Sequence, residues 1–332
     1  MPKPIADPVS AVPGPVREMA HESIRVAVVG AGAVGCYFGG MLARAGHEVT
    51  LIGRPLHVDP IRESGLRFEG LRFNGQIPVR ASTEADAVRG AQLVLFCVKS
   101  TDTETAAAQI APSLDGDSIV VSLQNGVDNA ERIQALVSRP VIAAVVYVAT
   151  EMAGPGHLKH HGRGDLVIGT PPGSALSAPA GVLARVQQWF EQAQVPVVVS
   201  DNVAPELWTK LVVNCAYNAV SAIAQVPYGT MIASAGIREV MRDVVGEALA
   251  VAAACGVHLA PDLLASVYRI AESMPAQLSS TAQDLARARP TEIDHLNGYL
   301  VRQGEARGVP VPVNRVLHSL LKLIEARQRT PA

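Results

Sequence analysis

The stretch IRVAVVGAGAVGCYFGGMLARAGHEVTLIGR, from Ile24 to Arg54, shows the clearest alternation of strand and helix in the chain. Its first part, residues 24–29, is a short apolar run rich in β-branched side chains, which is typical of a strand buried on both faces. A glycine turn and a helical stretch follow, and residues 48–52 again have the pattern of a strand. This order predicts the first β-α-β unit of a parallel sheet.

The turn after the first strand fits the pattern G-x-G-x-x-G. Gly30 makes the turn, Gly32 lets a pyrophosphate approach the backbone, and Gly35 lets the helix pack closely on the strand. The helix directs the positive end of its dipole at the phosphates. A simple tight turn is the alternative, but the strand before and the helix after favour a dinucleotide site. Its expected cofactor-binding residues are Gly30, Ala31, Gly32, Ala33, Val34 and Gly35.

The end of the second strand indicates which dinucleotide binds. Chains that bind NAD usually have an acidic residue there, which accepts hydrogen bonds from the ribose 2′-hydroxyl, whereas this chain has Gly53 and Arg54. A guanidinium group forms charge-assisted hydrogen bonds with a 2′-phosphate. The residues therefore favour NADPH as the cofactor, and a solvated arginine at the end of a strand is the alternative.

Length and composition indicate a two-domain enzyme without a nucleic-acid or membrane partner. The chain has 332 residues, of which 48% are hydrophobic and 17% charged, and this is enough for two cores. Because 28 basic residues stand against 30 acidic ones, no overall field attracts nucleic acid or an anionic membrane. The four cysteines lie far apart without a C-x-x-C motif, as reduced core residues do. Since no signal peptide or membrane-spanning run is evident, we expect a cytoplasmic protein.

Strand and helix patterns continue to alternate up to residue 200. After a hairpin-like pair at 66–69 and 71–79, we expect strands at 93–98, 119–123, 141–148 and 195–199, and helices at 103–112, 127–137 and 182–193. These units predict an α/β fold, a Rossmann-type doubly wound parallel sheet whose ligands lie beyond the carboxyl ends of its strands. We interpret residues 151–170 as an irregular connection with a pair of short strands. The histidines in it, His157, His160 and His161, have no acidic or cysteine ligand at a suitable spacing, so a surface turn is favoured over a metal site.

Three polar residues follow three different strands of this predicted sheet. They are Arg54, Lys99 and Asn125. Since the carboxyl ends of parallel strands meet at one edge, we expect a shared crevice there. Taken singly, Lys99 is equally well a surface lysine and Asn125 a turn former.

Beyond residue 200 every pattern is helical, which predicts an all-α C-terminal domain. The expected organisation is a disordered tail at 1–23, an NADP-binding domain at 24–200 and a helical substrate domain at 201–328.

The first helix of that domain, expected at 206–225, is apolar all round except for one narrow polar stripe. The stripe consists of Lys210, Asn214, Asn218, Ser221 and Gln225, which recur near one line at 100° per residue. A lysine on a buried helix is costly unless it is paired or faces a wet cleft. The stripe therefore predicts a cleft, and an ordinary solvent face is the alternative.

Further helices are expected at 237–255, 261–273 and 314–327. Between the last two, Thr291 and Asp294 suit a capping box, so that Glu292 reads as an acid that stabilises a helix N-terminus. The residues alone favour this structural role for Glu292 over a role in a site.

With these motifs in hand, the chain resembles the ketopantoate reductases (2-dehydropantoate 2-reductases) from Ile24 to its C-terminus. The matching segments, in order, are GAGAVGCYFGG, LIGR, VKSTDT, SLQNG, ELWTKLVVNCAYN, SSTAQDLARARPTEIDHLNG and VPVNRVL. The resemblance implies reduction of the 2-keto group of ketopantoate to pantoate by NADPH, on the route to pantothenate and coenzyme A.

The resemblance also implies roles for residues of the helical half. Lys210 would donate a hydrogen bond and then a proton to the ketone oxygen, and Glu292 would be the second catalytic residue. Asn214, Asn218 and Ser280 would hold the carboxylate and hydroxyl groups of the substrate. This raises Glu292 from a helix-capping acid to a site residue.

For the cofactor, the resemblance implies that Arg54 and Lys99 bind the adenosine phosphate end. Glu292 would also lie near the cofactor, and Asn125 would lie between cofactor and substrate. One departure is that the family has an asparagine in the turn after the catalytic helix, where this chain has Tyr228. Another branched 2-keto acid is therefore an open alternative, as is a non-catalytic protein that senses NADP. A small-molecule 2-keto acid is the expected partner, and a homodimer is left open.

Overall fold

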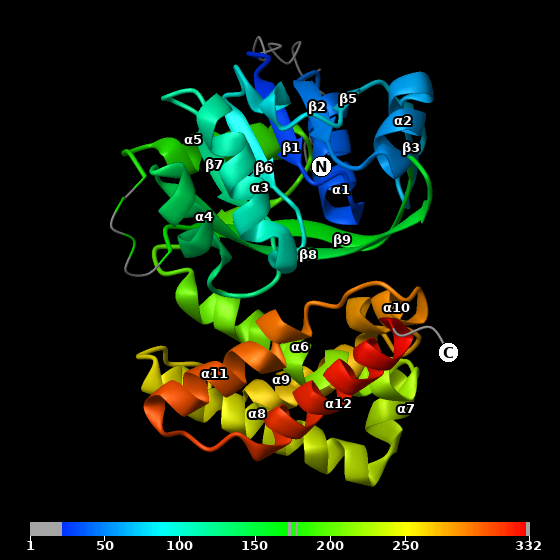
Figure 1. Cartoon of the computed structure of the whole chain (residues 1–332), viewed down its shortest axis with the longest axis vertical. Helices are drawn as coiled ribbons and strands as arrows, with labels where there is room; N and C mark the ends of the chain where they lie inside the picture. Colours follow the sequence, from blue (N-terminus) through cyan, green and yellow to red (C-terminus); the bar gives the residue numbers. More distant parts are fainter. Residues whose placement is uncertain (1–21, 172–173, 175, 177, 330–332) are drawn as a thin grey trace, which may run out of the picture.

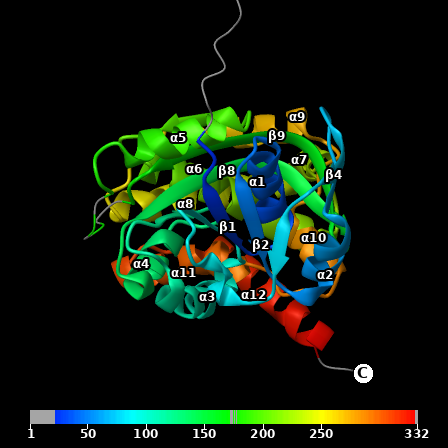
Figure 2. The same cartoon turned by 90° about the horizontal axis from the view of Figure 1, so that it is seen from above.

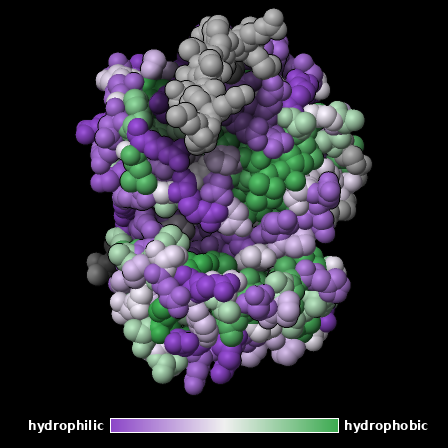
Figure 3. Space-filling model, turned by 180° about the vertical axis from the view of Figure 1, so that it is seen from behind, coloured by the Kyte–Doolittle hydropathy of each residue, from purple (hydrophilic) through white to green (hydrophobic). Residues whose placement is uncertain are grey.

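The computed structural model describes residues 22–171, 174, 176 and 178–329, and it has two lobes (Figure 1). The upper one, here called the sheet lobe, contains the strands of the described residues, and the lower one, the helical lobe, contains the helices that follow them. A view from behind shows a waist between the two lobes (Figure 3). All but the last two residues of the expected tail, 1–23, lie outside the described residues, as does part of the stretch after Thr170.

The strands of the sheet lobe are short where they are central and long at the waist. They are β1 (Arg25–Val29), β2 (Glu48–Ile52), β3 (Leu66–Glu69), β4 (Asn74–Ile77), β5 (Arg80–Ser82), β6 (Leu93–Phe96), β7 (Ile119–Ser122), β8 (Val141–Gly154), β9 (His157–Gly169) and β10 (Val197–Val199). Within the described residues they form one sheet in the order β4-β3-β9-β8-β7-β6-β1-β2-β5, with β10 beside β9. Its pairs are parallel except β3 with β4 and β8 with β9. The predicted fold class is confirmed.

Of the prediction for residues 151–170, the pair of strands is confirmed, but the irregular connection and the short length were wrong, because β8 and β9 form one long antiparallel hairpin there. The register shifts between Tyr147 and Val148, between Ala149 and Thr150, and between Met152 and Gly154. Such bulges interrupt the alternation of side chains from which a strand is recognised in sequence. The hairpin extends along the waist, below the rest of the sheet (Figure 1).

Helices cover both faces of the sheet (Figure 2). One face packs against α1 (Ala33–Arg44) and α5 (Val182–Gln192), and the other against α3 (Thr103–Ile110) and α4 (Asn129–Val137). A further helix, α2 (Pro55–Ser64), follows β2. The strands β1, β6 and β7 are buried on both sides, as their continuous apolar runs predict.

The helical lobe is built around α6 (Ala204–Ala224), which is largely buried. Its other helices are α7 (Tyr228–Ala233), α8 (Ala235–Ala254), α9 (Leu263–Ser273), α10 (Ser280–Ala286), α11 (Asn297–Arg307) and α12 (Pro312–Arg329). The start of α6 belongs to the sheet lobe, because Leu207 packs in the same apolar cluster as β8. Its later turns form the core of the helical lobe. The first turns of α6 therefore lie where the lobes meet. None of the described helices is long and apolar enough to cross a membrane.

Candidate active site

The glycine turn lies between β1 and α1 and forms an open cradle. Gly30 has a φ of 113°, and a Cβ there would lie 2.6 Å from the carbonyl carbon of Cys97, so only glycine fits. A Cβ on Gly32, by contrast, would meet no atom within 4 Å, so the space above this backbone is free. The helix makes its first hydrogen bond from the Cys36 N–H to the Gly32 oxygen, which leaves the N–H groups of the first turn without a partner inside the helix. These residues fit a pyrophosphate, because polarised N–H groups meet open space.

The loops after β2, β6 and β7 are linked by hydrogen bonds at the edge of the sheet. Arg54 follows β2, and its guanidinium lies 3.0 Å from the carboxylate of Asp102 in the loop after β6. In the same loop, Ser100 donates from its hydroxyl to the backbone oxygen of Asn125, 2.8 Å away. The Arg54 side chain is 85% exposed, so most of its donors face solvent. Arg54, Lys99 and Asn125 thus belong to one connected rim.

Lys99 connects this rim to the helical lobe. Its ammonium nitrogen lies 2.7 Å from the carboxylate of Asp284 in α10 and donates to the backbone oxygen of Pro290 at 2.8 Å. Burial raises the pKa of Asp284, and Lys99 opposes that shift. In this arrangement Lys99 holds the two lobes together.

Glu292 also reaches across the waist, which the residues alone did not indicate. Its carboxylate accepts the backbone N–H of Ser100 at 2.8 Å and the side-chain amide of Asn125 at 3.3 Å. The expected capping box is absent from this described segment, because the Thr291 hydroxyl donates to a carboxylate of α12 and Asp294 pairs with His318. Glu292 therefore contacts the sheet lobe instead of stabilising a helix.

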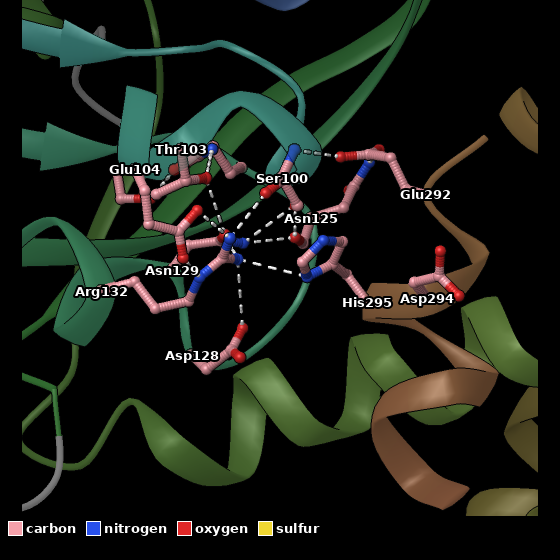
Figure 4. Close-up of polar contacts among 12 residues, drawn as sticks. Ser100, Thr103, Glu104, Asn125, Asp128, Asn129, Arg132, Glu292, Asp294 and His295 are labelled. Carbon is pink, nitrogen blue, oxygen red and sulfur yellow. Dashed lines mark hydrogen bonds and ion pairs between the residues drawn. The ribbon is translucent and has the colours of Figure 1, made fainter. Parts of the chain in front are cut away.

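Arg132, in α4, organises the rim from below (Figure 4). Its guanidinium makes two bonds of 2.7 Å to Glu104, one of 2.8 Å to the Ser100 oxygen, one of 2.8 Å to Asn129 and one of 3.2 Å to His295 Nδ1. All five N–H donors of the arginine are therefore used. Burial, followed by the nearby Arg132 cation, lowers the pKa of His295, so its Nδ1 can accept this bond. This cluster was not predicted from the sequence, because no local motif links residues that come from both lobes.

Lys210 lies in the second turn of α6, where the lobes meet. It is partly buried, its ammonium donates to the backbone oxygen of Val146 in β8, and it lies 5.9 Å from the centroid of the Tyr147 ring. Burial lowers the pKa of Lys210 to about 8, Glu292 opposes the shift, and Arg163 adds to it. Lys210 is thus a group that holds its proton at pH 7 and releases it more readily than an exposed lysine.

The remaining stripe residues divide into two groups. Asn214 is partly exposed and Asn218 is buried, and among the described residues their side-chain amides make no hydrogen bond. The far end of the stripe holds α10 in place: Ser221 accepts from the backbone N–H of Ser279, and Gln225 donates to a backbone oxygen of α10. Ser279 caps α10, which leaves the neighbouring Ser280 exposed at its first position.

A cleft of about 720 Å³ lies between the β8–β9 hairpin and the segment that joins α9 to α10. Gln225, at the far end of the stripe, lines it, whereas Lys210, Asn214 and Asn218 do not. Glu151 in β8 pairs across it with Arg287 at 3.1 Å. Tyr228 does not line this cleft, because its ring packs against Tyr217 with centroids 4.3 Å apart.

The three neighbouring histidines have separate partners. His157 pairs with Glu69 and His161 with Glu151, whereas His160 stacks on Tyr37. Among the described residues, no three His, Cys, Asp or Glu side chains form a group that could hold a metal ion.

A glycine cradle in one lobe and a partly buried lysine where the other lobe meets it are the parts of a nicotinamide-dependent oxidoreductase. Comparison with known proteins identifies the family of oxidoreductases to which the chain belongs. The model of the ketopantoate reductase PanE/ApbA family matches residues 26–173, and the model of its C-terminal part matches residues 202–325. The chain belongs to the ketopantoate reductase family, whose members use NAD(P)H.

Individual relatives agree with this. A 2-dehydropantoate 2-reductase of Archaeoglobus fulgidus is 32% identical over 91% of this chain and 98% of its own length. The crystal structure of a PanE/ApbA family ketopantoate reductase from Ralstonia eutropha JMP134 is 57% identical, with a TM-score of 0.87 over 92% of this chain and all of that one. A D-mandelate dehydrogenase, solved with NADH and anilino(oxo)acetate, is 25% identical with a TM-score of 0.86 over the same shares. The family therefore includes enzymes that are named for different substrates.

Proposed function

We propose that this reductase converts 2-dehydropantoate to pantoate with NADPH, in the synthesis of pantothenate and coenzyme A. The observation that carries the proposal is the position of Lys210, partly buried where the two lobes meet and bonded to the backbone of β8. Support also comes from the relatives named 2-dehydropantoate 2-reductase, which match the chain over about nine tenths of its length. Arg54, exposed at the rim with no acidic residue at the end of β2, favours the 2′-phosphate of NADPH.

In the proposed mechanism, Lys210 binds the keto oxygen and supplies its proton. NADPH, when bound, supplies the hydride that adds to the carbonyl carbon. Negative charge then develops on the oxygen, and an ammonium in a partly buried site stabilises it well. With a pKa of about 8, Lys210 is largely protonated at pH 7 and a stronger acid than an ordinary lysine. To reach the substrate, the ammonium exchanges the Val146 oxygen for the keto oxygen.

Glu292 would hold the two lobes in register during this step. Its carboxylate binds Ser100 and Asn125 at the rim and raises the pKa of Lys210. Asn214 and Asn218, whose amides have no described partner, would hold the carboxylate and hydroxyl groups of the substrate together with the exposed Ser280. Gly30 to Gly35, Arg54, Lys99 and Asn125 would bind the cofactor. For Lys99 this requires release from Asp284, so cofactor binding would loosen one contact between the lobes.

A second candidate is reduction of a different 2-keto acid with the same residues. The D-mandelate dehydrogenase among the similar structures favours it, and so does Tyr228, which packs into the helical lobe where the family has an asparagine. A protein that only senses NADP would have no use for a partly buried lysine at the waist.

Steady-state kinetics with NADPH tests the proposal. We expect the highest kcat/KM with 2-dehydropantoate, a lower value with 2-ketoisovalerate and the lowest with an aryl 2-keto acid such as phenylglyoxylate. A preference for phenylglyoxylate would establish the second candidate. Binding of NADPH without its oxidation by any of the three acids would favour the sensing protein.

A further inference from the structure

We propose that Arg163, in β9, also binds the carboxylate of the 2-keto acid, in addition to the side chains assigned to it above, while Lys210 binds its keto oxygen. This inference depends on the proposed function, since it requires a 2-keto acid substrate. Neither the sequence motifs nor the family resemblance points to Arg163, and its position follows from the bulges of the β8–β9 hairpin.

A bulge aims the Arg163 side chain. Tyr147 pairs with Asp165 and the next residue, Val148, pairs with Arg163, so Gly164 is an extra residue in β9. A Cβ on Gly164 would lie 2.0 Å from the hydroxyl oxygen of Tyr37, and this contact keeps the position glycine. Arg163 itself has a φ of 55°, which is uncommon for a long side chain. An unusual backbone conformation beside a proposed catalytic group is a reason to look for function there.

The bulge places Arg163 near Lys210. Its guanidinium carbon lies 4.1 Å from the centroid of the Tyr147 ring, and the Lys210 ammonium lies 5.9 Å from the same point. The two cations are therefore at most about 10 Å apart. A 2-keto acid carries its carboxylate on the carbon next to the keto group, and each ionic hydrogen bond adds about 3 Å. In the proposal, one such molecule contacts both cations.

Arg163 also has donors to spare. Asp165 accepts from Nε at 3.1 Å and from Nη2 at 2.6 Å, so it fixes the plane of the guanidinium along one edge. Nη1 donates to no other described residue, and the side chain is 55% exposed. A planar guanidinium with a free edge suits a carboxylate.

Arg163 is the cation that disfavours the protonated form of Lys210. Arg163 lowers the pKa of Lys210 and Glu292 raises it, while Asp165 and Glu206 act on the Tyr147 phenol, whose pKa burial raises. A substrate carboxylate would relieve the repulsion between the two cations. It would thereby favour the protonated Lys210 that the reaction needs.

The test compares the acid 2-ketoisovalerate with its uncharged methyl ester. For Arg163→Met we expect KM to rise about tenfold or more with the acid, because a bond to a charged group is lost, while KM with the methyl ester stays the same. Arg163→Lys keeps the positive charge but loses the paired N–H donors of the guanidinium. The KM with the acid should therefore rise less than in Arg163→Met. The alkaline limb of kcat should move to higher pH in Arg163→Met, because loss of this cation raises the pKa of Lys210. The matched control is Arg185→Met, which removes an arginine stacked 5.1 Å from Trp189 in α5.

Each outcome decides one question. An equal rise for acid and ester, or an acid KM that stays at the value of the Arg185→Met control, overturns the role of Arg163. If Arg163→Met does not fold, the ratio of acid to ester KM in Arg163→Lys decides in the same way. A wild-type protein that reduces neither 2-ketoisovalerate nor 2-dehydropantoate overturns the proposed function itself.

Discussion

Replacing Lys210 by methionine should make the protein more stable while it removes activity. Burial lowers the pKa of this lysine from 10.5 to about 8. At about 1.4 kcal/mol per pH unit, the buried charge costs at most about 3.5 kcal/mol of folding free energy at pH 7. Loss of the hydrogen bond to Val146 offsets about 1 kcal/mol. The expected net gain for Lys210→Met is on the order of 1–2 kcal/mol.

The stability advantage of Lys210→Met should depend on pH. Between the folded pKa of about 8 and the unfolded value of 10.5, the unfolded chain binds more protons than the folded one, so this group makes stability rise with pH. The cost of burial is fully present below about pH 8 and is gone above about pH 10.5. The advantage of Lys210→Met over wild type should therefore shrink across that window.

Urea unfolding at pH 7 and at about pH 10, followed by tryptophan fluorescence, measures both effects. Lys159→Met is the matched control, because Lys159 is exposed and pairs with Glu69 on the surface. It should stay within about 0.5 kcal/mol of wild type at both pH values. Our reasoning about the buried ammonium fails if Lys210→Met is less stable than wild type at pH 7, or if its advantage is the same at both pH values.

Three further predictions concern the cofactor turn and the rim. Arg54→Ala should reduce the preference for NADPH over NADH about tenfold or more, because ionic hydrogen bonds to the 2′-phosphate are lost; an unchanged ratio of kcat/KM values would remove Arg54 from the cofactor site. Gly32→Ala should weaken NADPH binding in a titration while the Tm hardly changes. Gly30→Ala should lower the Tm by several degrees, because a Cβ at Gly30 meets backbone atoms and a Cβ at Gly32 does not. Equal effects on Tm would contradict the open cradle. Glu292→Gln should move the alkaline limb of kcat below about pH 8, because Glu292 raises the pKa of Lys210; a limb that moves upward would contradict their coupling.

The sequence was most informative where local patterns dictate structure. Buried strands such as β1 and the glycine turn after it follow from apolar runs and from backbone positions that exclude a side chain. The polar stripe of α6 likewise follows from helical periodicity, which led to Lys210. These features depend on residues close together in the chain.

The sequence was least informative where distant residues meet. Glu292 has the local pattern of a helix cap, yet its carboxylate binds Ser100, 192 positions away. Arg132 and His295 meet across 163 positions without any motif to connect them. In the β8–β9 hairpin, an extra residue hides the strand pattern and at the same time gives Arg163 its unusual direction. Such contacts depend on how the lobes pack.

A single-turnover experiment tests whether Lys210 provides the proton. NADPH oxidation by 2-dehydropantoate is followed in wild type and in Lys210→Ala, and NADPH affinity is measured for both. We expect the rate to fall about 10²–10⁴-fold while the affinity for NADPH stays nearly the same. An unchanged rate, or an equal loss of rate and affinity, would contradict the role of Lys210 as the acid at the waist.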